Sequence, residues 1–133
     1  MNNGVRVVIP NHNYARFLAV CVESVLCQAG VDLEVLIIDD ASSDDSQRIA
    51  ASLAARDRRV RVRCHAANQG HIKTYNEGLE WAAGATYAVI LDADDALTPG
   101  RCAGHGSYSR RTPRPGSSTD APGFSRGMVL RRR

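Results

Sequence analysis

Two apolar runs in this chain end in clustered carboxylates. They are IIDDASSDDS at residues 37–46 and ILDADD at residues 90–95. In the second run Asp92 and Asp94 form an Asp-x-Asp pair, and on an extended segment two side chains at this spacing point the same way. Two hard oxygen donors this close suit Mg²⁺ or Mn²⁺, with phosphate oxygens completing the octahedron. The same residues also suit a polar turn in which Asp95 caps the next segment, so the local sequence leaves both interpretations open.

Asp39 and Asp40 follow the apolar residues of the first run. A carboxylate at the end of a strand can accept a hydrogen bond from a nucleobase ring N–H, or it can bond backbone N–H groups of its own loop. The local sequence supports both alternatives equally. The two common phosphate-binding loops, G-x-G-x-x-G after the first strand and G-x-x-x-x-G-K-[ST], are absent. A metal ion is then the natural way to hold a diphosphate.

Three further polar residues are candidates for ligand contact, and each has a simpler structural interpretation. His12 can stack on a nucleobase or be a solvated loop residue. Asn68, with Gly70 after it, fits turn chemistry first and ligand contact second. Lys73 can meet a diphosphate, although a lone lysine on a helix is usually solvated.

Hydrophobic periodicity predicts the elements that must position these residues. Aliphatic, mostly β-branched runs predict four strands, and amphipathic spacing predicts three helices between them. The strands fall at residues 5–9, 33–38, 60–64 and 86–91, and the helices at residues 15–28, 44–56 and 71–83. In the last helix we expect Ile72, Tyr75 and Leu79 to face inward.

This alternation predicts an α/β fold, a Rossmann-like βαβαβαβ parallel sheet with helices on both faces. Such sheets bind ligands beyond the carboxyl ends of their strands, at the switch in strand order. The polar residues that follow the predicted strands would share that edge, and they are Asn11, His12, Asp39, Asp40, Asn68, Asp92, Asp94 and Asp95. The clustered carboxylates would then form the rim of a binding crevice.

The net charge of +3 is unevenly distributed along the chain. Residues 101–133 hold eight arginines and one acidic residue, Asp120. The four cysteines include no C-x-x-C pair, so we expect buried reduced thiols rather than a zinc site. The N-terminus lacks a signal-peptide pattern and no apolar run reaches the ~18 residues of a membrane span, so we expect a cytoplasmic chain.

Three segments at matching spacing resemble the family 2 glycosyltransferases with the GT-A fold. They are VVIPNHNYARFLAVCVESVLCQ, EVLIIDDASSDDS and NQGHIKTYNEGLEWAAGATYAVILDADDALTPG. The resemblance covers about residues 5–100. It implies transfer of a sugar from a nucleotide-diphosphate donor to an acceptor, with inversion and with a divalent metal, Mn²⁺ or Mg²⁺.

The resemblance also implies roles for the residues that match the family's motifs. Pro10, Asn11 and His12 lie where the family wraps the nucleoside, although tyrosine is common where His12 stands. Asp40, with Asp39 beside it, matches the position that bonds the base.

At the second motif, Asp92 matches the acid near the ribose and the metal, and Asp94 matches the principal metal ligand. Asp95 supports the loop. Asn68 and Lys73 are the other two residues that we expect to contact the nucleotide sugar.

The chain departs from the family after residue 100. Family members continue well beyond Asp-x-Asp, and that second half supplies the acceptor site and a carboxylate general base. We therefore expect residues 1–100 to be a nucleotide-sugar-binding half domain that is truncated and inactive in this form. The acceptor, whether saccharide, lipid or protein, is not specified, and peripheral membrane association is expected only of a full-length relative. A non-catalytic module that binds nucleotide sugar and metal is the alternative.

The segment of residues 101–133 reads as a disordered basic tail, rich in Arg, Ser, Gly and Pro. Read from the third base of the Gly100 codon, permitted codons also allow the translation ALRRARLVLAAHPEAGLVYG. That sequence is an amphipathic helix followed by an apolar strand, which is how these glycosyltransferases continue. We therefore hypothesise a frameshift, in which case the basic charge does not indicate a nucleic-acid partner, and we expect none.

Overall fold

The computed structural model describes residues 4–28, 30–97 and 128–131, and of the last segment only the backbone. Five strands form one sheet in the order β3-β2-β1-β4-β5. They are β1 (Val5–Asn11), β2 (Leu33–Asp39), β3 (Val60–Cys64), β4 (Tyr87–Ile90) and β5 (Met128–Arg131). The first four run parallel, and β5 pairs antiparallel with β4. The predicted α/β fold with a four-stranded parallel sheet is confirmed.

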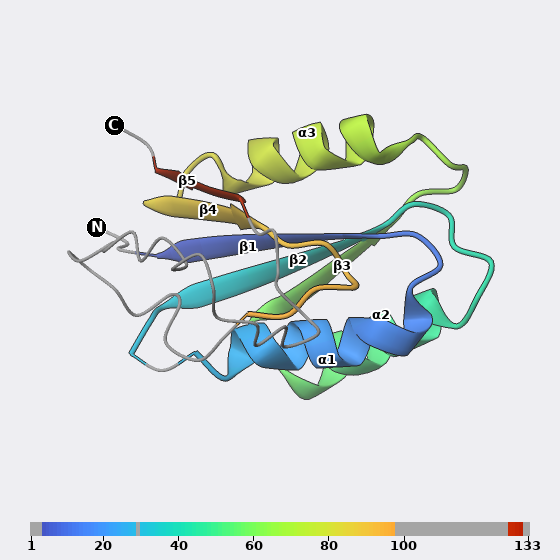
Figure 1. Cartoon of the computed structure of the whole chain (residues 1–133), viewed down its shortest axis with the longest axis horizontal. Helices are drawn as coiled ribbons and strands as arrows, with labels where there is room; N and C mark the ends of the chain where they lie inside the picture. Colours follow the sequence, from blue (N-terminus) through green and yellow to red (C-terminus); the bar gives the residue numbers. More distant parts are fainter. Residues whose placement is uncertain (1–3, 29, 98–127, 132–133) are drawn as a thin grey trace, which may run out of the picture.

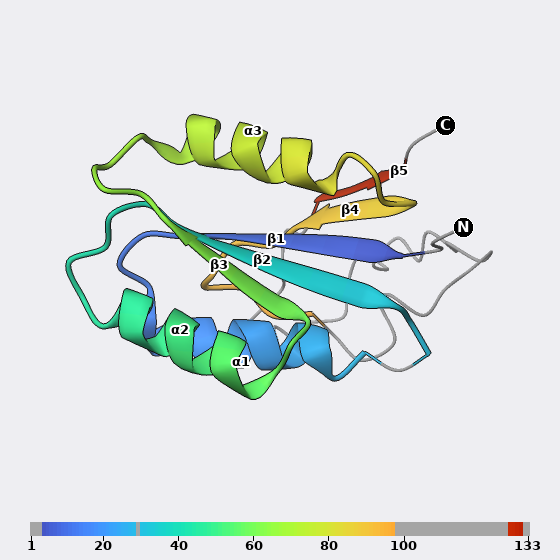
Figure 2. The ribbon, with the colours of Figure 1, turned by 180° about the vertical axis from the view of Figure 1, so that it is seen from behind.

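Three helices cover the two faces of this sheet. They are α1 (Ala15–Leu26), α2 (Ser46–Arg56) and α3 (His71–Ala82). Helices α1 and α2 lie together on one face and α3 lies alone on the other, as both views of the ribbon show (Figures 1 and 2). Each predicted helix is present, and its ends lie within about two residues of the expected ones.

The middle of the central strand β1 is buried on both sides, which explains the apolar run of residues 7–9. Val7 and Ile9 belong to the core beneath α1 and α2, whereas Val8 belongs to the core beneath α3. All three side chains are completely buried. Adjacent residues of a strand point to opposite faces, so a strand covered on both faces needs apolar residues at every position.

Helix α3 contacts the sheet through small residues. Thr74, Gly78 and Ala82 are buried on it at intervals of four, and a Cβ atom at Gly78 would overlap the side chain of Val8. The expectation that Ile72 faces inward is wrong, because its side chain is 66% exposed. The close approach of α3 to β1 turns the face with small residues inward and rotates Ile72 toward solvent.

Met128–Arg131 forms β5, within the segment that was expected to be a disordered tail. The expectation for the segment as a whole stays a prediction. One expectation about the cysteines is corrected. Cys21 is buried, but Cys27 and Cys64 are exposed, so buried thiols were correctly expected only for the first.

Some expectations concern residues outside the described part of the chain. Cys102 lies there, as does most of the segment to which the disordered-tail and frameshift hypotheses apply. No helix among the described residues is both long enough and apolar enough to span a bilayer.

Candidate functional site

A pocket of about 470 Å³ opens at the carboxyl edge of the sheet. Strand β2 lies on one side of β1 and β4 on the other, so the strand order switches at β1, where α/β sheets bind their ligands. The predicted site residues that line it are Pro10, Asn11, His12, Asp40, Asn68, Asp92 and Asp94. Asp39, Lys73 and Asp95 are not part of its lining.

One side of the pocket is built around Asp40, directly after β2. Its side chain is only 6% exposed and is held by donors of the protein itself. The backbone N–H groups of Gln69 and Gly70 donate to it at 2.7 and 2.9 Å. The His65 imidazole donates from Nδ1 at 2.9 Å. Asp40 thus bonds backbone N–H groups of the distant 65–70 loop. The bond to an N–H group of its own loop, expected as an alternative for this pair of acids, is made by Asp39, which accepts the Ser42 N–H at 3.0 Å.

The same imidazole reaches a second carboxylate on α3. His65 Nε2 donates to Glu77 Oε2 at 2.6 Å, and Arg63 donates to the other oxygen of Glu77 at 3.2 Å. We call Asp40, His65, Glu77 and the N–H groups of Gln69 and Gly70 the Asp40 cluster.

Charges and hydrogen bonds inside this cluster shift the proton equilibria of its members. Burial acts to raise the pKa of Asp40, but the Gln69 N–H, His65 and the Gly70 N–H outweigh it, and the pKa lies below its ordinary value. Hydrogen bonding to Asp40 raises the pKa of His65, burial opposes this, and Glu77 adds to the rise. The cluster therefore favours the charged form of the imidazole between two carboxylates.

His65 was missed as a candidate residue. It stands directly after β3, so the rule that collected the polar residues following the other strands would also have found it. Asn68, from the same loop, was included, and its Oδ1 accepts the Gly70 N–H at 3.0 Å in the turn that was expected.

Asp39 is completely buried and serves the loop behind the pocket. It accepts Asn11 Nδ2 at 2.8 Å, the Ser42 hydroxyl at 2.6 Å and Gln47 Nε2 at 3.0 Å. These bonds tie the end of β1 to the segment that leads into α2. Asn11 Oδ1, in a residue that lines the pocket, has no hydrogen-bond donor among the described residues.

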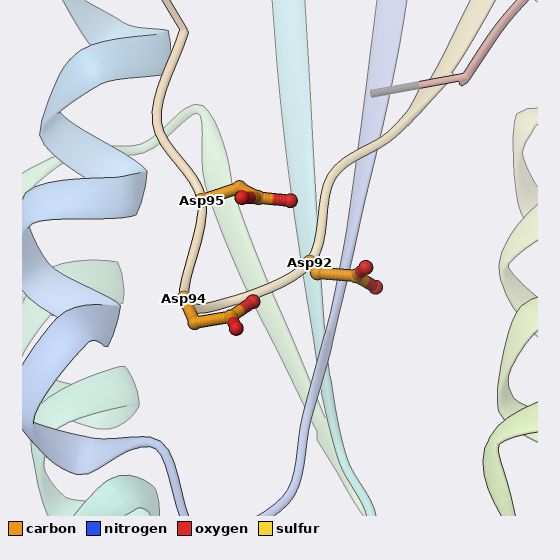
Figure 3. Close-up of side chains that lie close together, drawn as sticks. All are labelled: Asp92, Asp94 and Asp95. Atoms are coloured by element: carbon orange, nitrogen blue, oxygen red, sulfur yellow. The ribbon is translucent and has the colours of Figure 1, made fainter. Parts of the chain in front are cut away.

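The opposite side of the pocket is a tight turn with three carboxylates, which we call the acidic turn: Asp92, Asp94 and Asp95 (Figure 3). One oxygen from each lies within 4.8 Å of the others. Asp94 is exposed, and Asp92 and Asp95 are half-buried. The Asp95 N–H donates to the Asp92 carbonyl at 2.9 Å and closes the turn.

Two side chains from helices on opposite faces of the sheet contact Asp92 of the acidic turn. The Tyr75 hydroxyl donates to Asp92 Oδ1 at 2.6 Å, and Cys21 Sγ lies 3.5 Å from the Asp92 carbonyl oxygen. Burial and the bond to Asp92 raise the pKa of Tyr75 to about 12. Burial, reinforced by the charges of the turn, raises the pKa of Cys21 to about 12. Both groups therefore stay protonated beneath the carboxylates.

The acidic turn fits a hard divalent cation. Its donors are all carboxylate oxygens, the ligands preferred by Mg²⁺ and Mn²⁺, and a cation would relieve the repulsion among three like charges. Within the part of the chain that the structure describes, this is the one group of three such ligands.

Two other predicted contacts differ in their relation to the pocket. His12 is exposed at the mouth, and its Nδ1 donates to the backbone carbonyl of Asp40 at 2.7 Å. Lys73 is exposed on α3 and does not line the pocket. The geometry thus places His12 at the site and leaves Lys73 beside it.

The fold and this site belong to a known family. The sequence model of the family described as Glycosyl transferase family 2 matches residues 6–106. Since this match covers most of the chain, the chain belongs to the family 2 glycosyltransferases, as the three motifs indicated.

Curated relatives agree with this assignment. An uncharacterized glycosyltransferase of Nostoc, alr2836, is 38% identical over 95 residues, which are 71% of this chain and 29% of the relative. The glycosyltransferase GlyG of Streptococcus pneumoniae is 35% identical over 97 residues, 73% of this chain and 32% of GlyG. The chain thus spans about a third or less of the length of these relatives.

Solved structures share the fold. The mannosyltransferase PcManGT of Pyrobaculum calidifontis, in complex with GDP-Man and Mn²⁺, aligns with a TM-score of 0.65 at 23% identity, over 72% of this chain and 29% of that one. TarS 1–349 of S. aureus in complex with UDP aligns with a TM-score of 0.64 at 22% identity, over 71% and 28%. The alternating strands and helices match the GT-A structures, as expected.

Proposed function

We propose that residues 4–97 bind the nucleotide-sugar donor of a glycosyltransferase together with Mn²⁺ or Mg²⁺. One observation carries the proposal. A single pocket at the switch in strand order has a carboxylate held by three protein donors on one side and three clustered carboxylates on the other. A nucleoside diphosphate has the matching polarity, with a hydrogen-bonding base at one end and a charged diphosphate that needs a cation at the other.

The base would lie on the side of Asp40. Oδ1 of Asp40 already accepts two bonds, from His65 and Gln69, whereas Oδ2 accepts one, from Gly70. A carboxylate offers about four acceptor positions, so one position on Oδ2 remains for a ring N–H of the base. Asp39 would act only indirectly, by holding Asn11.

Three residues at the end of β1 would wrap the nucleoside. Pro10, Asn11 and His12 line the pocket between Asp40 and the acidic turn. The exposed ring of His12 offers a flat surface for the base, and Asn11 Oδ1 offers a buried acceptor.

The diphosphate would lie on the side of the acidic turn. Asp92 and Asp94 would hold the cation, and Asp95 would keep the turn closed through its backbone bond to Asp92. When bound, the cation supplies Lewis-acid stabilisation of the charge that develops on the departing nucleoside diphosphate. Tyr75 keeps the Asp92 carboxylate oriented by its hydrogen bond.

Calorimetric titration tests this assignment. UDP, GDP, UDP-GlcNAc and GDP-mannose are titrated into the chain with and without Mn²⁺, and into Asp94→Ala. We expect binding of at least one nucleotide that depends on Mn²⁺ and is lost in Asp94→Ala. Asp45→Ala is the matched control, because Asp45 is an exposed acid of the other acidic run and does not line the pocket. Absence of binding by the folded chain would contradict the proposal.

Turnover is a separate question. The prediction that this 133-residue chain does not transfer sugar remains a prediction, and release of free UDP or GDP from the bound sugar nucleotide measures it. Binding without such release would favour the alternative of a donor-binding module.

A further inference from the structure

His65 joins three elements of the fold at one wall of the pocket. Its side chain is only 8% exposed and lies between Asp40, which follows β2, and Glu77 on α3. Its backbone N–H also donates to the Asp39 carbonyl at 2.8 Å. The end of β3 is thereby linked to both neighbouring elements.

The two ring nitrogens of His65 both face carboxylate oxygens, at 2.9 and 2.6 Å. An ionised carboxylate only accepts hydrogen bonds, so both nitrogens must carry a proton for both bonds to form. A neutral imidazole has one protonated nitrogen, and its other lone pair would face a carboxylate. The bridge is therefore complete only in the imidazolium form.

The groups that face this imidazole come from three elements. Asp40 lies at the end of β2, Glu77 lies on α3, and Arg63 on β3 donates to the same Glu77. Arg63 partly offsets the charge of Glu77, and Asp40 remains the direct counter-charge on the side of the pocket.

The bridge reaches the ligand side through Asp40. The same carboxylate fixes the N–H groups of Gln69 and Gly70, and Gly70 is the N-terminal cap of α3 with a φ of 86°. The Gly70 carbonyl in turn accepts the N–H and the hydroxyl of Thr74. Asp40, Gly70 and Thr74 all line the pocket, so His65 contacts the pocket lining through Asp40.

We propose that the His65 imidazolium is a positioning residue that holds Asp40 and the 65–70 loop in the arrangement that receives the nucleoside. The proposal rests on the proposed donor site. Under this proposal, binding of the nucleotide sugar depends on the protonation of His65, a residue that does not itself line the pocket.

The sign of the dependence follows from the raised pKa of His65. The stabilising bridge is fully present below about pH 6.5, the ordinary value for histidine, and is lost as the pH rises through the higher value of the folded chain. Nucleotide affinity should therefore fall on the alkaline side.

Nucleotide titration over a pH series that runs upward from about 6.5, the ordinary pKa of histidine, tests the proposal with UDP and GDP as probes in the presence of Mg²⁺. We expect the wild-type affinity to fall by about tenfold over the alkaline part of this series, the effect of losing one charge-assisted hydrogen bond. His65→Gln should bind weakly at all pH values and lose the pH dependence of the wild type. Arg61→Gln, which removes a charge from an exposed position of β3, should keep the wild-type profile.

A second variant and a direct measurement cover the case in which His65→Gln does not fold. Glu77→Gln keeps an acceptor for Nε2 but removes the charge, so the midpoint of the affinity loss should move to lower pH. Imidazole ¹⁵N chemical shifts should show His65 protonated on both nitrogens at neutral pH. A titration of His65 at or below its ordinary pKa, or an unchanged midpoint in Glu77→Gln, would overturn the proposal.

Failure of the two proposals can be told apart. If no nucleotide binds at any pH while the spectra show the imidazolium, the donor site itself is wrong and the positioning role falls with it. If nucleotide binds with the same pH profile in wild type and His65→Gln, only the positioning role is wrong.

Discussion

Asp40 and Asp94 both follow a buried parallel strand and both line the pocket, but their surroundings are opposite. Asp40 is 4% exposed and has three donors from the protein, one of them an imidazole. Asp94 is exposed, and two more carboxylates lie beside it. Similar acidic motifs can therefore be surrounded by donors of the protein at one strand end and by like charges at the other.

The surrounding donors, rather than the acids themselves, distinguish the Asp40 cluster from the acidic turn, which we call the two corners of the pocket. A buried carboxylate is stable only when hydrogen bonds and opposite charge replace its lost hydration. The Asp40 cluster supplies both. The acidic turn instead gathers negative charge, and the side chain that donates to its Asp92 carboxylate is the uncharged hydroxyl of Tyr75. A cation is the simplest group to complete it.

Isosteric amides at the two corners should give the largest difference. Asp40→Asn removes the counter-charge of His65 and faces two backbone N–H groups with an amide that can turn its NH₂ toward them. Breaking such a buried pair costs about 3 kcal/mol or more of unfolding free energy. Asp94→Asn in metal-free buffer should leave stability near the wild-type value, because it removes like-charge repulsion at an exposed position. Urea unfolding measures both, and equal losses would contradict the distinction.

Helix α3 contributes to both corners, through Glu77 to the Asp40 cluster and through Tyr75 to the acidic turn. Gly78→Ala should weaken the contacts of Glu77 and of Tyr75 together, because the new methyl group overlaps Val8 and pushes the helix away from β1. Overpacking of this kind costs about 1–3 kcal/mol. Thermal and urea unfolding measure it.

Gly84→Ala is the control for this change. A Cβ there meets only Arg6 Nη1 at 3.6 Å, an ordinary contact, so it should be tolerated. A Gly78→Ala protein as stable as Gly84→Ala would show that α3 has room to move.

Divalent cation should act on one corner only. Mn²⁺ at about ten times its dissociation constant should stabilise the wild type by about 1.4 kcal/mol, because a ligand that binds only the folded chain adds RT ln(1 + [L]/Kd). Asp94→Asn should lose this gain, whereas Arg63→Gln, altered beside the Asp40 cluster, should keep it. Differential scanning fluorimetry with and without Mn²⁺ measures it, and equal gains in wild type and Asp94→Asn would place the cation elsewhere.

Most of the fold could be predicted from periodicity. The β-branched runs of β1 and β2 and the stripe of α1 each had one consistent interpretation, since burial on defined faces leaves a regular pattern. Ile72 could not be placed correctly, because the inward face of α3 is set by the contact of Gly78 with Val8, a tertiary constraint that periodicity does not contain. β5 was not among the predicted elements, because a run of four residues is too short to show a clear period.

For the candidate site, the sequence predicted the edge of the sheet at which its residues gather. Strand ends placed Asn11, Asp40, Asp92 and Asp94 around one pocket, because parallel strands share a carboxyl edge. The sequence left open whether Asp40 bonds backbone N–H groups or a ligand, and its bonds to Gln69 and Gly70 depend on how the 65–70 loop folds back onto β2. Tyr75 was expected in the core, and its hydroxyl bond to Asp92 has no signal in local sequence.

Tyr75→Phe should have the smallest effect on stability, and it tests whether the acidic turn can be altered without changing the Asp40 cluster. It keeps the ring and removes only the hydroxyl that holds Asp92 Oδ1. The loss of one hydrogen bond to a charged group costs about 1.5 kcal/mol or less here, because Asp92 is half-buried and water can replace the donor. Mn²⁺ affinity should fall a few fold as Asp92 gains freedom, whereas the imidazole ¹⁵N shifts of His65 should not change. Unchanged Mn²⁺ affinity would mean that Tyr75 only fills space beneath the turn, and a change at His65 would mean that α3 couples the two corners.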